Sequence, residues 1–175
     1  VFALEVEAGT EFDDFKKIFT GVGKINAAYH LFKGIQKYNP DIVINLGTAG
    51  STLFNRGEVV CCNQFIQRDM DVMALGFQKF ETPFSNGEVV LNYGLEIPNL
   101  PKGICGSGDQ FEMEHNNHEY NVIEMEAYAL AKVCKEENLP FLCLKYISDG
   151  ADGNAVEDWQ TEVKKAAIAL KNALI

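Results

Sequence analysis

The amino-acid sequence predicts an α/β fold in which helices flank a central sheet. Residues 41–46 and 141–147 are near-continuous apolar runs, the pattern of strands that are buried inside a parallel sheet. Apolar residues also recur at helical spacing after Lys24 and from Val156 to Leu174. Because strand-like and helix-like segments alternate along the chain, an α/β arrangement accounts for them best.

The elements can be placed in order along the chain. Five strands are expected, over residues 17–20, 41–46, 57–65, 104–106 and 141–147. Helices are expected after Lys24, over residues 125–138 and from Val156 to Leu174. Pro40 ends the first helix, and the glycine-containing segment 47–51 is expected to be a loop that lets the backbone approach a ligand closely.

Length and charge limit the possible functions. The chain has 175 residues, enough for one domain with a sizeable core. Its net charge of −10 argues against a nucleic-acid backbone or an anionic membrane as a partner. No run approaches the roughly 18 apolar residues of a membrane span, and no signal peptide opens the chain. Five cysteines without a Cys-x-x-Cys pair indicate reduced, packed thiols and a cytoplasmic protein.

The segment from Val122 to Ala127 carries the most chemical information. It places Glu124 and Glu126 at the end of an apolar run and directly before a helix. Carboxylates that enter apolar elements usually have a partner, and an ionised carboxylate can accept hydrogen bonds from two adjacent ribose hydroxyls. The alternative is that both glutamates are surface residues at a strand-to-helix junction.

Polar residues recur where the predicted strands end. In open α/β sheets, ligands bind at the carboxyl ends of the strands. The alternative is that such residues are turn and cap residues. The polar residues at these ends are Thr48, Asp109, Glu126, Ser148 and Asp149.

Six segments, in this order along the chain, together carry a resemblance to known proteins: Ala3–Glu7, Gly21–Ala28, Asn45–Gly50, Ser107–Phe111, Ile123–Ala127 and Ile147–Asp149. With them the chain resembles the nucleoside phosphorylase and nucleosidase superfamily, and most of all its 5′-methylthioadenosine/S-adenosylhomocysteine nucleosidases. The resemblance implies a single domain over residues 1–175 with a mixed central β-sheet flanked by helices, a purine nucleoside as ligand, a homodimer, and neither a metal nor an organic cofactor.

The resemblance also implies which residues act on the glycosidic bond. Glu7 would activate the attacking water, and Glu126 would bind the ribose hydroxyls above Met125. Asp149, oriented by Ser148, would protonate or hydrogen-bond N7 of the purine.

Further residues would shape the binding site. Phe111 would stack on the base, and the backbone at Glu112, which replaces an apolar residue of the family, would read the base edge. Thr48 would line the ribosyl face. Val22 and Leu4 would border the ribose and its 5′ substituent, whose identity stays open.

The chemistry requires these residue types. Cleavage of an N-glycosidic bond leaves negative charge on the purine, which a carboxylic acid near N7 neutralises. Asp149 must then be protonated near neutral pH, which burial would bring about, whereas Glu7 must stay ionised to accept a proton. Taken alone, Asp149 could equally be a turn residue and Glu7 a surface carboxylate.

Arginine content separates water from phosphate as the nucleophile. Phosphate sites use cationic donors, best supplied by arginine, and this chain has only Arg56 and Arg68. Asn45 stands where the resembling phosphorylases carry an arginine. We therefore expect hydrolysis; a phosphorylase with an unusual phosphate site and a nucleoside-binding protein without turnover are the alternatives.

Two further patterns have structural interpretations. Phe77, Phe80 and Phe84 form an aromatic stripe, expected to belong to the core or to a subunit interface. His115 and His118 are separated by two residues, but no third ligand lies near them in the sequence, so a solvated loop is favoured over a metal site.

Overall fold

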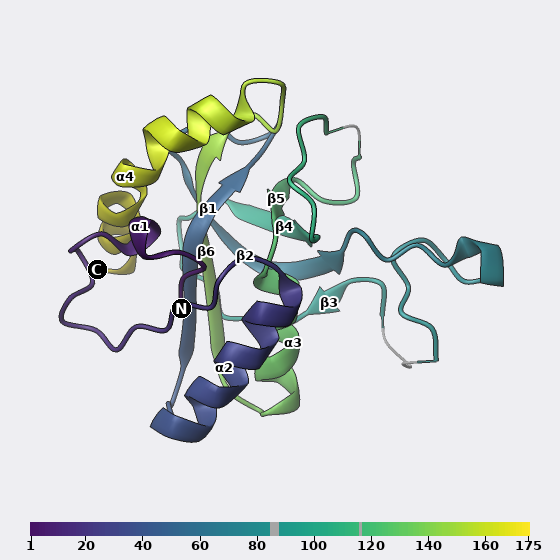
Figure 1. Cartoon of the computed structure of the whole chain (residues 1–175), viewed down its shortest axis with the longest axis horizontal. Coiled ribbons are helices and arrows are strands. Elements are labelled where there is room, and N and C mark those ends of the chain that lie inside the picture. Colours follow the sequence, from purple (N-terminus) through teal and green to yellow (C-terminus); the bar gives the residue numbers. More distant parts are fainter. Residues whose placement is uncertain (85–87, 116) are drawn as a thin grey trace.

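A six-stranded mixed sheet lies between helices in the computed structural model, which describes residues 1–84, 88–115 and 117–175 (Figure 1). The strands are β1 (Val43–Gly50), β2 (Val59–Gln67), β3 (Leu91–Asn92), β4 (Lys102–Ser107), β5 (Val122–Glu124) and β6 (Phe141–Asp149). The helices are α1 (Glu5–Ala8), α2 (Lys24–Tyr38), α3 (Ala127–Glu136) and α4 (Ala155–Leu174), with a 3-10 turn η1 (Met73–Leu75).

The strand order is β3-β2-β4-β5-β1-β6, and both pairing directions occur. β1 and β6 are parallel, as are β2 with β4 and β4 with β5. β6 also pairs antiparallel with β2, so the sheet curves back on itself. The prediction of a mixed central sheet flanked by helices is confirmed.

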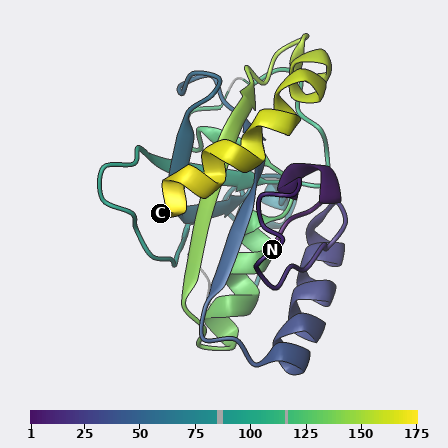
Figure 2. The same cartoon turned by 90° about the vertical axis from the view of Figure 1, so that its left-hand side faces the viewer.

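The pleat of β6 divides its side chains between two cores, because successive residues of a strand point to opposite faces. Cys143 and Ile147 pack in the core that includes α2 and α3. Leu142 and Leu144 pack in the core beneath α4, which lies across the other face of the sheet (Figure 2). Lys145 has the same parity as Cys143 and Ile147, so its side chain is on the α3 face.

The predicted strand at residues 17–20 is wrong. Phe19 forms only an isolated bridge with Phe2. The Phe2 N–H donates to the Ile18 carbonyl and the Thr20 N–H donates to the Phe2 carbonyl, each at 3.0 Å. The pairing does not extend further because the partner segment turns into α1 directly after Leu4.

The predicted loop at residues 47–51 is also wrong, since β1 continues through Gly50. The glycines there serve close packing rather than a turn. A Cβ at Gly47 would lie 3.3 Å from Glu7 Oε1, and one at Gly50 would lie 2.5 Å from Asp149 Oδ1. The absence of side chains at these two positions of β1 therefore leaves room for two carboxylates.

The remaining expected elements are present with shifted ends, whereas α1, η1, β3 and β5 were not anticipated as elements. Among the described residues, the longest helices lack the apolar length needed to cross a lipid bilayer. The five cysteines are buried free thiols. Between β2 and β3 the chain extends away from the sheet and carries η1 at its end (Figure 1).

Candidate active site

All ten residues that sequence analysis assigned to the site line one cavity of about 250 Å³. It is bounded by α1, the carboxyl ends of β1, β5 and β6, and the loop between β4 and β5. The ten are Leu4, Glu7, Val22, Thr48, Phe111, Glu112, Met125, Glu126, Ser148 and Asp149.

Glu7 reaches the cavity from α1 and is only 5% exposed, so it is not a surface carboxylate. Its Oε1 accepts hydrogen bonds from the Thr48 N–H (2.9 Å) and the Thr48 hydroxyl (2.8 Å). Its Oε2 accepts one from the Leu4 N–H at 3.1 Å. The indole N–H of Trp159 donates in turn to Thr48 Oγ1 at 2.9 Å, so α4 helps to fix this corner of the cavity.

Asp149 ends β6 and is 4% exposed. The Ser148 hydroxyl donates to its Oδ2 at 2.8 Å, and the Ala151 N–H donates to its Oδ1 at 2.9 Å. Burial raises the pKa of Asp149 despite these two hydrogen bonds, and the nearby carboxylates of Asp158 and Asp152 add to the increase. At a given pH, Asp149 is therefore protonated to a greater extent than an exposed aspartate would be.

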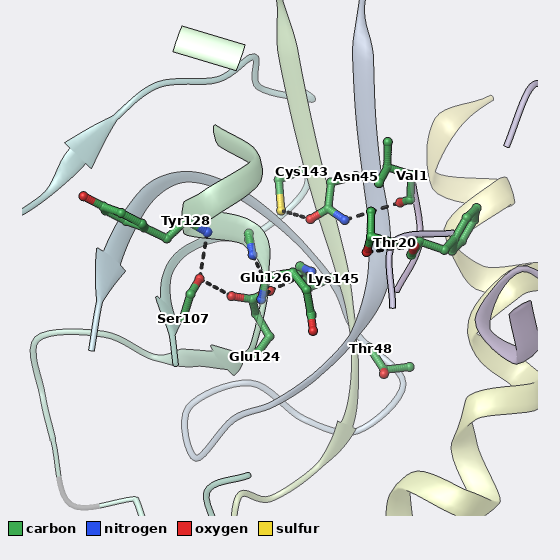
Figure 3. Close-up of polar contacts among 12 residues, drawn as sticks. Val1, Thr20, Asn45, Thr48, Ser107, Glu124, Glu126, Tyr128, Cys143 and Lys145 are labelled. Atoms are coloured by element: carbon green, nitrogen blue, oxygen red, sulfur yellow. Dashed lines mark hydrogen bonds and ion pairs between the residues drawn. The ribbon is translucent and has the colours of Figure 1, made fainter. Parts of the chain in front are cut away.

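Glu124 and Glu126 are buried, so the surface interpretation of this pair is wrong. Glu126 Oε1 accepts a hydrogen bond from the Gly23 N–H at 2.8 Å. Glu124 bonds to Ser107 and to the ammonium of Lys145, whose Nζ lies 3.1 Å from Glu124 Oε2 (Figure 3). Lys145 lies in the middle of β6, 2% exposed.

Apolar residues form the open part of the cavity. Phe111 and Val22 are 46% and 43% exposed, whereas the carboxylates opposite them are buried. Leu4 and Met125 also line the cavity and are partly exposed to solvent. The cavity therefore offers an apolar entrance for a flat or aliphatic group and acidic groups deeper inside.

Arg68, at the end of β2, was not anticipated as a site residue and also lines the cavity. Its Nη1 lies 3.0 Å from Glu112 Oε2, and its Nη2 donates to the Gln110 carbonyl. Glu112 also bonds to His115 Nδ1 at 2.7 Å, so the acidic side chain at this position joins a buried polar network. Arg68 therefore holds the segment on either side of Phe111.

Replacing Arg68 with methionine should lower the free energy of unfolding by about 3 kcal/mol, because it removes the cation from a largely buried ion pair. Urea denaturation followed by circular dichroism measures this change. Lys102→Met is the matched control, since Lys102 pairs with Glu96 in the exposed part of the structure, and it should cost less than about 1 kcal/mol. Equal losses of unfolding free energy in the two variants would contradict the stabilising role of the Arg68–Glu112 ion pair.

Other residues were missed as well. Trp159 and Lys145 gave a signal that could have been used: a lone tryptophan on the closing helix and a lysine inside an apolar strand. Within the described ranges, no group of three or more histidine, cysteine or acidic side chains could hold a metal ion. The solvated-loop interpretation agrees with His118, which is exposed, but it is wrong for His115, whose side chain is only 2% exposed and contacts Glu112.

Comparisons with known proteins agree with this geometry. Residues 18–175 match the family model of the phosphorylase superfamily. The chain is 32% identical over 170 residues to the 5′-methylthioadenosine/S-adenosylhomocysteine nucleosidase of Staphylococcus saprophyticus, covering 86% of this chain and 75% of that protein.

Two solved structures from Helicobacter pylori share the fold. The 5′-methylthioadenosine/S-adenosylhomocysteine nucleosidase has a TM-score of 0.88 at 19% identity, with 99% of this chain and 93% of the other covered. The futalosine hydrolase has the same TM-score, identity and coverage, 0.88, 19%, 99% and 93%. With the family match spanning nearly the whole sequence, the chain belongs to the phosphorylase superfamily and, within it, to the family of 5′-methylthioadenosine/S-adenosylhomocysteine nucleosidases.

Proposed function

We propose that this chain, acting as one domain over residues 1–175, hydrolyses the N-glycosidic bond of 5′-methylthioadenosine, S-adenosylhomocysteine or both, and releases adenine. The family of the chain supports this reaction. The observation that carries it is that three buried carboxylates, Glu7, Glu126 and Asp149, face one cavity although they come from opposite ends of the sequence.

Asp149 is the general acid of the proposed reaction. As the bond between C1′ and N9 breaks, its electron pair passes into the purine, and N7 takes the proton of the Asp149 carboxyl. Ser148 orients the acid through its hydrogen bond. Phe111 stacks on the base, and the backbone of Glu112 reads the base edge. The raised pKa of Asp149, caused chiefly by burial, supports this role because it favours the form that carries the proton.

Glu7 is the general base. It takes a proton from a water molecule whose oxygen bonds to C1′ of the ribosyl cation, while Glu126 binds the sugar hydroxyls. The three hydrogen bonds that Glu7 accepts from Leu4 and Thr48 fix its carboxylate toward the cavity. Val22, Leu4 and Met125 border the ribose and its 5′ group. The reaction so written uses neither a metal nor an organic cofactor.

The charge of the cavity supports water over phosphate as the nucleophile. Its lining includes Glu7, Glu112, Glu124, Glu126 and Asp149, whereas Arg68 is the cation among the described lining residues. That arginine is already paired with Glu112. A phosphate dianion would meet net negative charge without a free cationic donor.

A panel of purine nucleosides that differ only at the 5′ carbon tests the proposal. Free adenine, separated by chromatography, should form from the 5′-methylthio nucleoside at the same rate with and without phosphate, and the sugar product should carry no phosphate. A rate that depends on phosphate would instead indicate a phosphorylase. Tight binding without release of base would indicate a nucleoside-binding protein.

We also propose a homodimer in the cytoplasm. The extension between β2 and β3 exposes apolar side chains: Met73, Leu75 and Phe84 are 50%, 73% and 91% exposed. Such a patch is more often an interface than a solvated surface. The five buried free thiols fit a reducing compartment.

A further inference from the structure

A buried ion pair lies directly behind the residue proposed to hold the sugar. Lys145 and Glu124 are 2% and 6% exposed, and Lys145 Nζ lies 3.1 Å from Glu124 Oε2. The same oxygen of Glu124 accepts the N–H of Glu126 at 2.9 Å, so the pair is bonded to the backbone of Glu126 (Figure 3). Neither member of the pair is used in the proposed chemistry.

The two glutamates are unequally supplied with donors. Among the described residues, Glu124 accepts hydrogen bonds from the Ser107 hydroxyl, the N–H groups of Glu126 and Ala127, and the Lys145 ammonium. The side chain of Glu126, in that same part of the chain, accepts one from the Gly23 N–H. Each bond to an ionised carboxylate stabilises its charge. An additional proton in this region would therefore go to Glu126 before Glu124.

Charged groups reach Glu126 from several elements. Glu7 on α1 and Glu124 on β5 add negative charge near Glu126, whereas Lys145 on β6 adds positive charge. Gly47 lies between two of these groups, since a Cβ there would be 3.3 Å from Glu7 Oε1 and 3.6 Å from Lys145 Nζ. Asp109 approaches Gly23 from the loop after β4, but its carboxylate is paired with Lys24 at 3.0 Å. Lys145 therefore acts on Glu124, which it contacts directly, and on the neighbouring carboxylate of Glu126.

We propose that the Lys145–Glu124 pair is a positioning element that sets the charge of Glu126, and that it thereby controls how firmly the sugar hydroxyls are held. The proposal rests on the proposed function, since it takes Glu126 as the ribose-binding carboxylate. An ionised Glu126 can accept a hydrogen bond at each oxygen, whereas a protonated one loses part of this capacity.

The electrostatic surroundings of Glu126 shift its pKa into the range in which its charge can be controlled. Burial and the adjacent Glu124 carboxylate raise the pKa of Glu126 to about 7, against the opposing effects of Lys145 and the Gly23 N–H. Burial alone would raise the pKa of Glu124 too, but Lys145 and the hydrogen bonds hold it below its ordinary value. Near neutral pH, Glu126 is thus poised between its two forms while Glu124 stays ionised.

Removing each partner of the pair should move the charge of Glu126 in opposite directions. Lys145→Met removes attraction, so the pH below which kcat/KM for 5′-methylthioadenosine declines should rise by about one unit. Glu124→Gln removes the repulsion that acts on the Glu126 carboxylate and leaves the lysine in place. The acid-side limb of the pH profile, where kcat/KM declines, should then move to lower pH. Inhibition by free adenine, which lacks the sugar, should keep its wild-type strength in both variants at pH 7.

Two more variants provide the controls. The double variant Lys145→Met/Glu124→Gln lacks both charges and should return the limb close to that of the wild type; neutral replacements of both partners are usually tolerated by the fold. Glu126→Gln cannot titrate and should lose the part of the acid-side decline that reports Glu126, leaving the decline caused by protonation of Glu7. A purely structural role would instead raise KM equally at all pH values, and shifts of the same sign in both single variants would overturn the proposal.

Carboxyl titration by carbon-13 NMR tests the charge in the wild-type protein without any turnover. Glu126 should titrate near neutrality while Glu124 stays ionised through the same range. Titration of Glu126 at the ordinary glutamate value would overturn the inference even if hydrolysis is confirmed. Absence of hydrolysis with the predicted titration would instead contradict the proposed function and leave the charge coupling standing.

Discussion

Asp149→Asn should abolish hydrolysis of 5′-methylthioadenosine while the nucleoside still binds. Asparagine has nearly the same shape: its Oδ1 can still accept from the Ala151 N–H, and its amide group can donate to the Ser148 hydroxyl oxygen instead of accepting from it. Unlike a carboxylic acid, however, the amide cannot transfer a proton to N7. Loss of a general acid typically lowers the rate by about 10²–10⁴-fold. Single-turnover kinetics should show the loss in the chemical step, and calorimetric titration should show binding within a few-fold of the wild type.

Asp152→Asn is the matched control for this variant. Asp152 follows in the next turn, is exposed and does not line the cavity, so turnover should persist. Because its carboxylate helps to raise the pKa of Asp149, its removal should move the alkaline limb of kcat slightly to lower pH. The direction follows from the acid role: the protonated form exists below the pKa and is lost as pH rises through it. Wild-type turnover by Asp149→Asn would reject the acid assignment.

Glu7→Gln should produce the second large loss, again about 10²–10⁴-fold in kcat, with KM changed little. A glutamine carbonyl can still accept the bonds from Thr48, so the cavity keeps its shape, but the side chain can no longer take a proton from water. Steady-state rates of adenine release across a range of substrate concentrations separate kcat from KM.

Glu5→Gln controls for a change of charge in the same short helix. Glu5 is exposed and outside the cavity, whereas Glu7, two positions on, is buried inside it. Glu5→Gln should therefore behave like the wild type in both kcat and KM. If the two glutamine variants lost activity equally, a general effect of charge on α1 would explain the result and the base assignment would fail.

Local sequence patterns predicted the two central strands that carry part of the site, whereas most of the site residues were expected only from the family resemblance. The apolar runs that became β1 and β6 are buried on both faces, which leaves a continuous signal in the sequence. Polar residues at the ends of those runs then met at one edge, as parallel strands require. The prediction of a loop at Gly47 and Gly50 was wrong because glycine is used both in turns and where side chains pack closely against the backbone. The side chains that pack there, from Glu7 and Asp149, come from elsewhere in the chain.

Cross-strand partners could not be predicted in the same way. Lys145 and Glu124 are 21 positions apart, and Arg68 and Glu112 are on segments joined only through the tertiary structure. Their pairing depends on the register between strands, which no local pattern specifies. The lysine inside an apolar strand could have indicated that some acidic group lies near it, but not which one.

The double pairing of β6 has a consequence for how the enzyme can lose activity. Its backbone is bonded to β1 on one side and, over residues 143–146, to β2 on the other, so the stretch that carries Lys145 is not an edge that can fray. Local opening at low free-energy cost, common in loops and terminal segments, is therefore disfavoured for this stretch. We expect Lys145 to remain in register until the whole domain melts, and heat inactivation to coincide with global unfolding.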